Sequence, residues 1–154
     1  MKFGFIGTGK ISSSVITGIS SSKIKFTQIY VSPRNKKIAA KLEKKFKKIS
    51  IGKSNQEIVD KCNWVFLSVT PKVGERIIKE LKFKSNHTII SFISTITLAQ
   101  LKSAVKVRAK IIRAIPLPPI SLKKGPVPIC PPNKKVKDFF NKIGTTVEIK
   151  NEKS

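Results

Sequence analysis

A glycine-rich turn near the start of the chain constrains the fold more than any other feature. Residues 2–7 form a short apolar run that predicts a buried strand, and residues 11–19 carry apolar side chains at the spacing of one helix face. Gly7 and Gly9 stand between the two, and Ser12 completes the pattern G-x-G-x-x-small. A strand that turns over glycines directly into a helix is the opening half of a βαβ unit.

The rest of the chain repeats this alternation of strand and helix signals. Further strands are expected at residues 28–32, 48–51, 64–69, 88–92, 110–115, 127–130 and 145–149. Helices are expected between them, with N-terminal caps at Ser54, Thr97 and Asn133. This pattern predicts an α/β fold, a Rossmann-type doubly wound sheet of about seven or eight mostly parallel strands in three layers. Residues 1–149 are expected to form one domain and residues 150–154 a tail.

Positive charge is the most conspicuous feature of the composition. The chain has 154 residues and a formal net charge of +24, from 32 basic and 8 acidic residues, and such a field attracts polyanions. Specific nucleic-acid readers rely on arginine forks and aromatic platforms, but this chain has only four arginines, one Trp and one Tyr. The lysines of residues 41–48 are interpreted as a solvated helix face, with a binding patch as the alternative. We expect no specific nucleic acid as a partner.

Several classes of protein are excluded by composition. Cys62 and Cys130 are too few for a disulfide scaffold and lack metal-ligand spacing, so no metal is expected. The longest apolar-leaning stretch, residues 88–101, is too short and too polar to span a membrane, and no signal peptide is visible. A cytoplasmic location is therefore expected. The single histidine, His87, is expected at the surface or in a cap, and no residue is identified as catalytic.

The glycine turn also has the chemistry of a dinucleotide site. Gly7 permits the tight turn, Gly9 lets a pyrophosphate approach the backbone, and Ser12 lets helix and strand pack closely. The amide groups and the dipole of the following helix would face the phosphates. The alternative is an ordinary strand–helix turn without a ligand.

The end of the second expected strand indicates which dinucleotide binds. An NAD site places an acidic residue there, roughly 20 residues after the glycines, to bind the ribose 2′-hydroxyl. This chain has Ser32, Arg34, Lys36 and Lys37 in that segment and no carboxylate. Arginine pairs with a phosphate dianion through charge-assisted bonds, so the segment predicts NADP(H). The alternative is that Arg34 is simply a turn residue.

Two more segments are candidates for cofactor contact. Residues 67–72, at the end of the fourth expected strand, hold an extended backbone ahead of Pro71, which either lines the crevice or only ends the strand. Asn55 is a candidate for contact with the adenosine, and equally for capping a helix.

Taken in order, these segments resemble one family. The matching stretches are 3–11, 31–34, Asn55, 66–71, 90–91 and 112–116. Their order and spacing are similar to those of the N-terminal domain of pyrroline-5-carboxylate reductase. The resemblance implies an NAD(P)H-dependent reduction of a cyclic imine, 1-pyrroline-5-carboxylate, to proline, and hence a part in proline biosynthesis. It also implies cofactor contacts at Ile6, Gly7, Thr8, Gly9, Lys10, Ile11, Ser32, Arg34, Asn55, Ser68, Val69, Thr70 and Pro71, with Ser94 near the nicotinamide.

Three departures from the family's pattern bear on this interpretation. Ser94 and Thr95 stand where the family has Ala-Gly, and Leu117 stands where it has an amide side chain. The family also continues into a helical dimerisation domain that completes the substrate pocket, whereas this sequence ends at Ser154. The expected partners are a small imine substrate and either that helical domain or a second copy of the chain. The alternative function is an NADP-binding module without catalytic activity of its own.

Overall fold

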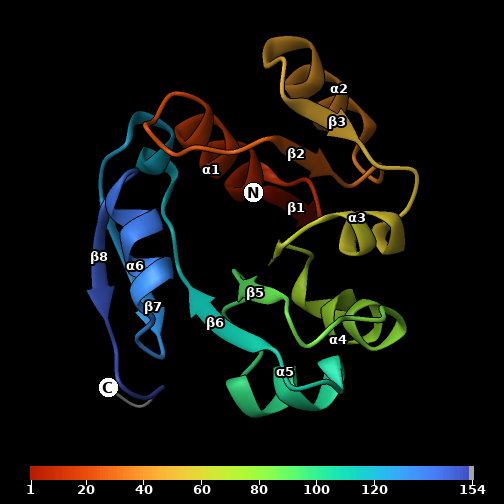
Figure 1. Cartoon of the computed structure of the whole chain (residues 1–154), viewed down its shortest axis with the longest axis vertical. Helices are drawn as coiled ribbons and strands as arrows, with labels where there is room; N and C mark the ends of the chain where they lie inside the picture. Colours follow the sequence, from red (N-terminus) through yellow and green to blue (C-terminus); the bar gives the residue numbers. More distant parts are fainter. Residues whose placement is uncertain (153–154) are drawn as a thin grey trace.

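The strands form one eight-stranded sheet in the order β3-β2-β1-β4-β5-β6-β7-β8, in a computed structural model that describes residues 1–152 (Figure 1). They are β1 Lys2–Ile6, β2 Gln28–Val31, β3 Ile49–Ile51, β4 Trp64–Leu67, β5 Thr88–Ser91, β6 Lys110–Ala114, β7 Pro126–Cys130 and β8 Thr145–Glu148. Neighbours are parallel except β6 and β7. Their connection holds only the 3-10 helix η1, Pro118–Leu122, and no crossover α-helix, which suits an antiparallel pair. The predicted mostly parallel sheet is confirmed.

Helices cover both faces of this sheet. They are α1 Lys10–Ser20, α2 Lys36–Lys45, α3 Asn55–Lys61, α4 Pro71–Glu80, α5 Leu98–Val105 and α6 Lys134–Asn141. Buried side chains of α1, α2 and α6 belong to one apolar cluster, and those of α3, α4 and α5 belong to a second. Along β4, Phe66 joins the first cluster while Val65 and Leu67 join the second, so the predicted three layers are confirmed. None of the helices in residues 1–152 is long and apolar enough to cross a membrane.

Side-chain caps determine where several helices begin. The Asn133 side chain accepts a hydrogen bond from the Val136 amide (3.0 Å) at the start of α6, and the predicted capping box opens α5. At α3 the Ser54 hydroxyl accepts from the Glu57 amide (3.2 Å). The Glu57 carboxylate accepts from the Lys53 amide (3.2 Å) instead of the Ser54 amide, so only half of a capping box forms there.

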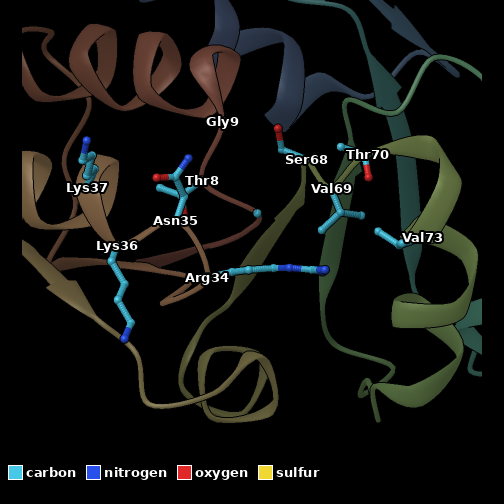
Figure 2. A pocket seen from close by; sticks show the side chains of 11 residues that line it. Thr8, Gly9, Arg34, Asn35, Lys36, Lys37, Ser68, Val69, Thr70 and Val73 are labelled. Atoms are coloured by element: carbon cyan, nitrogen blue, oxygen red, sulfur yellow. The ribbon is translucent and has the colours of Figure 1, made fainter.

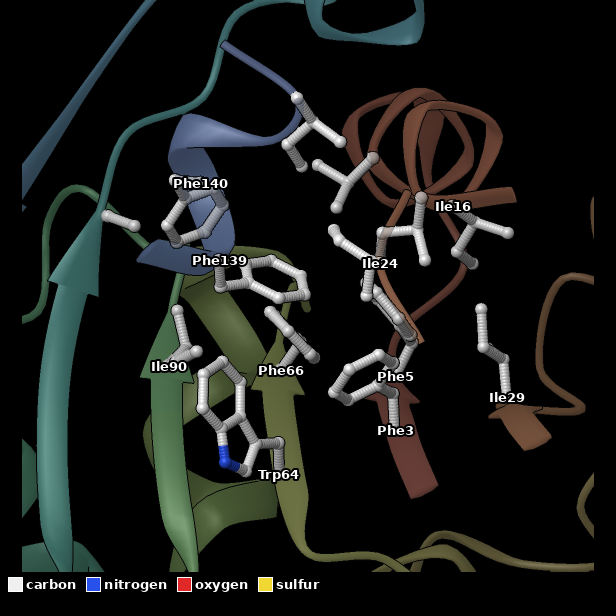
Figure 3. Packing of buried hydrophobic residues seen from close by; sticks show 14 of the residues in the cluster. Phe3, Phe5, Ile16, Ile24, Ile29, Trp64, Phe66, Ile90, Phe139 and Phe140 are labelled. Atoms are coloured by element: carbon white, nitrogen blue, oxygen red, sulfur yellow. The ribbon is translucent and has the colours of Figure 1, made fainter. Parts of the chain in front are cut away.

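An aromatic cluster joins the two central strands to α6. Phe5 of β1 and Phe66 of β4 stack with their ring centroids 4.5 Å apart, and both are fully buried (Figure 3). Phe3 meets Phe139 of α6 edge-on, with centroids 5.4 Å apart. Aromatic side chains bury large apolar areas, and stacked or edge-on pairs add to that burial. The cluster therefore holds β1 beside β4, the two strands whose carboxyl ends carry the site described below.

Two details differ from what the sequence predicts, besides strand ends that shift by a single residue. β4 ends at Leu67 and not at residue 69, because the backbone leaves the sheet before α4 begins at Pro71. The sequence predicts His87 at the surface or in a cap, but the residue is only 4% exposed, so the surface alternative is wrong. Its Nδ1 accepts from the Lys84 amide (2.8 Å) and its Nε2 donates to the Val59 carbonyl (2.9 Å), so the ring serves the local fold.

The end of the described chain is attached to the domain. Glu148 closes β8, and the Glu152 carboxylate accepts a hydrogen bond from the Leu98 amide (3.1 Å) at the start of α5. Of the predicted tail, residues 153–154 lie outside the described residues.

Replacing Phe66 by alanine should lower the free energy of unfolding by about 3–5 kcal/mol, because the cavity left in the aromatic cluster cannot close. Urea denaturation followed by circular dichroism measures this loss. Leu122→Ala is the matched control, since Leu122 is 68% exposed and its truncation should change stability by less than about 0.5 kcal/mol. A similar loss in both variants would contradict the central role of the cluster.

Candidate functional site

A crevice of about 620 Å³ opens at the carboxyl ends of β1, β2 and β4 (Figure 2). β1 lies between β2 and β4, so this is where the strand order changes direction. Ligands of doubly wound sheets bind at such a switch point. The crevice is lined by Gly7, Thr8, Gly9, Arg34, Asn35, Lys36, Lys37, Ser68, Val69, Thr70 and Val73.

The glycine turn forms one wall of the crevice. Gly7 has a φ of +95°, and a Cβ there would lie 2.6 Å from the Ser68 carbonyl oxygen, so only glycine fits. At Gly9 a Cβ would meet no atom within 4 Å, so the backbone there is open to a ligand. Ser12 is fully buried, and its hydroxyl donates to the Gly7 carbonyl (3.0 Å). The first-turn N–H groups of α1 have no acceptor within the helix, and the helix begins at this crevice.

A buried hydrogen-bond chain ties the turn to the end of β2. The Thr8 hydroxyl donates to the Ser32 carbonyl (2.8 Å), and the Ser32 hydroxyl donates to the Asn55 side-chain oxygen (3.1 Å). Thr8 and Ser32 are both buried. Because the Asn55 oxygen is engaged, its NH₂ group is what remains available to donate. Ser54 caps α3, so the alternative of a capping role for Asn55 is wrong.

The segment after β2 makes the crevice basic. Arg34, Lys36 and Lys37 line it, and none of its lining residues is Asp or Glu. Figure 2 shows the Arg34 side chain extended across the crevice toward Val69, while Lys36 points away from it. The side chain of Asn35 caps α2 and so fixes the backbone that carries these cations. The site can attract a phosphate group, and no carboxylate lines it to accept from a ribose hydroxyl.

The segment after β4 forms the opposite wall. The Ser68 amide donates to the Ile6 carbonyl (2.8 Å), and residues 68–70 then run into α4. Pro71 takes the first position of α4, where its missing N–H costs nothing. Val73, in the first turn, adds an apolar contact surface. The segment therefore both ends the strand and lines the crevice.

Half of the sequence-predicted cofactor residues line this crevice, and all but one of the others adjoin it. The lining ones are Gly7, Thr8, Gly9, Arg34, Ser68, Val69 and Thr70. Ser32 and Asn55 join the hydrogen-bond chain behind Thr8, and Ile6 is buried in the second apolar cluster. Lys10, Ile11 and Pro71 belong to the first turns of the adjoining helices.

Sequence reasoning misses two lining residues, Asn35 and Val73. Asn35 carries a detectable signal, because an asparagine directly before a helix pattern is a preferred cap. The signal for Val73 is its place in the helical turn that Pro71 opens, beside the predicted segment.

Ser94 lies outside the crevice. Its carbonyl accepts from the Arg113 guanidinium, which also pairs with the Glu152 carboxylate. Burial and the neighbouring Glu152 raise the pKa of the Cys130 thiol, and Arg113 partly opposes them. Leu117 is 45% exposed and does not line the crevice either. Arg113, Glu152 and the Cys130 thiol thus form a second polar group at the edge where β6 and β7 pair.

The part of the chain that the structure describes holds no cluster of metal ligands, and its two thiols have raised pKa values. Within residues 1–152, no group of three or more His, Cys, Asp or Glu residues is arranged to hold a metal ion. Burial raises the pKa of the Cys62 thiol to about 12, so this thiol stays protonated at neutral pH.

The family model described as "NADP oxidoreductase coenzyme F420-dependent" matches residues 2–95 of the chain. Pyrroline-5-carboxylate reductase of Escherichia coli is 31% identical over 134 residues, which cover 84% of this chain and 49% of that protein. Pyrroline-5-carboxylate reductase 3 of Danio rerio is 30% identical over 128 residues, which cover 81% and 44%. The chain thus spans about half the length of the curated relatives it matches.

Solved structures show the same similarity. 1-Pyrroline-5-carboxylate reductase from Streptococcus pyogenes superposes with a TM-score of 0.81 at 26% identity, covering 97% of this chain and 58% of that one. Plasmodium falciparum pyrroline carboxylate reductase, solved with NADP bound, gives a TM-score of 0.85 at 24% identity, covering 98% and 58%. The predicted resemblance to pyrroline-5-carboxylate reductases is confirmed, and the predicted cofactor, NADP(H), is confirmed at the level of the family.

Gly7→Ala should destabilise the fold by at least about 1–3 kcal/mol, because the backbone is left-handed there and the new Cβ would clash with Ser68. Gly9→Ala is the matched control. Its φ of −98° suits any residue and its Cβ meets nothing, so stability should stay within about 0.5 kcal/mol. Urea denaturation of both variants checks the difference, and equal losses would contradict the close approach at Gly7.

Proposed function

The chain belongs to the family described as NADP oxidoreductase, coenzyme F420-dependent, and from this premise we propose that it is the cofactor-binding part of an NADPH-dependent imine reductase. The proposed substrate is 1-pyrroline-5-carboxylate, a small cyclic imine that would be reduced to proline. The observation that carries the proposal is the crevice between the glycine turn and Arg34. The similarity to proteins named pyrroline-5-carboxylate reductase supports the choice of substrate.

The residues of the crevice fit an NADP molecule. Gly9 leaves its backbone uncovered beside the free amides of α1, where a pyrophosphate would be held. Arg34, whose side chain extends across the crevice, provides a cation for a ribose 2′-phosphate, and no Asp or Glu lines the crevice to repel that phosphate. The crevice volume of about 620 Å³ lies within the usual range of ligand pockets.

When bound, NADPH supplies the hydride, and the residues of this chain position the cofactor and shield it. The hydrogen-bond chain from Thr8 through Ser32 to Asn55 holds the turn and the β2 end in one geometry. Such preorganisation lowers the ordering cost of binding. Val69 and Val73 add apolar surface on the β4 side, where they would keep water from part of the cofactor.

A second candidate function is an NADP-binding module without turnover of its own. One observation favours it: the crevice is lined by no His, Asp or Glu that could act as a general acid.

Arg34→Ala should weaken NADPH binding about tenfold to hundredfold and leave NADH binding nearly unchanged, because only NADPH carries the 2′-phosphate. Isothermal titration calorimetry with both cofactors measures this. Arg108→Ala is the matched control, since it removes the same charge from an exposed site outside the crevice. Equal losses for NADPH and NADH, or an equal effect of Arg108→Ala, would contradict the role of Arg34.

Consumption of NADPH by the purified chain should depend on added 1-pyrroline-5-carboxylate, and the fall in nicotinamide absorbance measures it. Turnover that requires the imine distinguishes the reductase from the binding module. NADPH binding without turnover would assign the second candidate function. A chain that binds no NADPH would overturn both.

A further inference from the structure

A second cavity, of about 300 Å³, lies at the opposite edge of the sheet from the crevice. Trp64, Thr88 and Lys110 line it, and these residues begin β4, β5 and β6 at their amino ends. Asn133 and Lys135 add the start of α6. None of the residues that line the cavity is Asp or Glu. The cavity therefore carries positive charge without a carboxylate to neutralise it.

Trp64 gives the cavity an indole N–H donor that has no partner in the described part of the protein. The residue is 7% exposed, and its ring packs against Phe3 and Phe139 with centroids 5.8 and 5.2 Å apart. Figure 3 shows the indole nitrogen turned away from this aromatic cluster, toward the amino end of β4. Within residues 1–152 the indole N–H donates to no protein acceptor. An indole N–H that donates to no protein group is free to donate to an acceptor from outside the protein.

The amide side chains around Trp64 also present donors. The Asn63 oxygen already accepts from the Lys2 amide (2.8 Å), and the Asn133 oxygen accepts from the Val136 amide (3.0 Å). Each side chain is left with its NH₂ group.

Two backbone carbonyls and the ring of His87 beside this donor set are already hydrogen-bonded within the fold. The backbone carbonyl of Asn63 accepts from the Thr88 amide (3.1 Å), and that of His87 accepts from the Lys110 amide (3.3 Å). Both ring nitrogens of His87 are engaged within the fold. The groups left to meet a ligand include the indole N–H, the amide groups of the lining asparagines and the ammonium groups of two lysines, together with the Ser85 and Thr88 hydroxyls.

We propose that this cavity binds a small oxyanion, a metabolite that carries a phosphate or carboxylate group. Such a group accepts several hydrogen bonds at once and is attracted by both ammonium groups. The cavity volume is at the lower limit of ligand pockets, so the ligand is compact and not a dinucleotide. The proposal is independent of the proposed function, because the two sites lie at opposite edges of the sheet.

Trp64 is the only tryptophan in the chain, so its fluorescence reports on this cavity directly. The full chain is titrated with inorganic phosphate, and separately with malonate, at ionic strength held constant with potassium chloride. We expect a saturable change in Trp64 emission with at least one of the two anions. A response to phosphate assigns phosphorylated ligands, and a response to malonate alone assigns carboxylates.

Three variants make the test specific. The double variant Lys110→Gln/Lys135→Gln should lower, at least tenfold, the affinity for whichever anion changes the Trp64 emission. Lys41→Gln/Lys44→Gln removes the same charge from the exposed face of α2 and should leave the affinity unchanged. Arg34→Ala should also leave the Trp64 response unchanged, because phosphate held in the crevice lies far from the indole.

Some results would overturn the proposal. A Trp64 response that saturates with neither anion would do so. An equal loss of anion affinity in both double-lysine variants would also do so, because it would show a general effect of charge. Loss of the response in Arg34→Ala would place the anion in the crevice instead. Circular dichroism of each variant confirms that the fold is retained.

Discussion

The close approach of two backbones, at Gly7 and Ser68, is the constraint on which the rest of the site depends. A Cβ at Gly7 would lie 2.6 Å from the Ser68 carbonyl oxygen, so the turn after β1 can reach the end of β4 only as glycine. This approach closes the gap between the central strands and aims α1 at the crevice. Beneath it, the stacked rings of Phe5 and Phe66 hold the same two strands together. The ring packing and the backbone geometry at Gly7 thus both favour the arrangement in which β1 lies directly beside β4.

The strong positive charge is distributed in a way that the fold explains. Ala39 and Leu42 of α2 are buried, and the lysines of that helix lie on its other faces, in solvent. Within residues 1–152 only four ion pairs form, so most cations have no acidic partner. A cation can select a particular ligand only where helix caps and buried groups hold the surrounding residues in place. This holds at Arg34 beside the glycine turn, and at Lys110 and Lys135 beside Trp64.

Much of the fold and part of the site follow from local patterns. The alternation of short apolar runs with amphipathic stretches predicts the order of the elements, because these periods reflect which side each residue faces. The glycines after the first strand and the arginine after the second predict that phosphate groups bind in the crevice. This prediction also depends only on short stretches of neighbouring residues. Strand ends are less well predicted: β4 stops at Leu67, since its apolar character continues into Val69 while its backbone leaves the sheet.

What the sequence by itself determined is the fold class, the glycine turn and the basic character of the segment after β2, because each depends on neighbouring residues. Only the tertiary structure decided which side chains meet across the chain. It buried His87 between Lys84 and Val59, placed Ser94 against Arg113 and away from the crevice, and gathered donors around Trp64. These contacts join residues from separate elements, so their geometry depends on how the layers pack, and no local period encodes it.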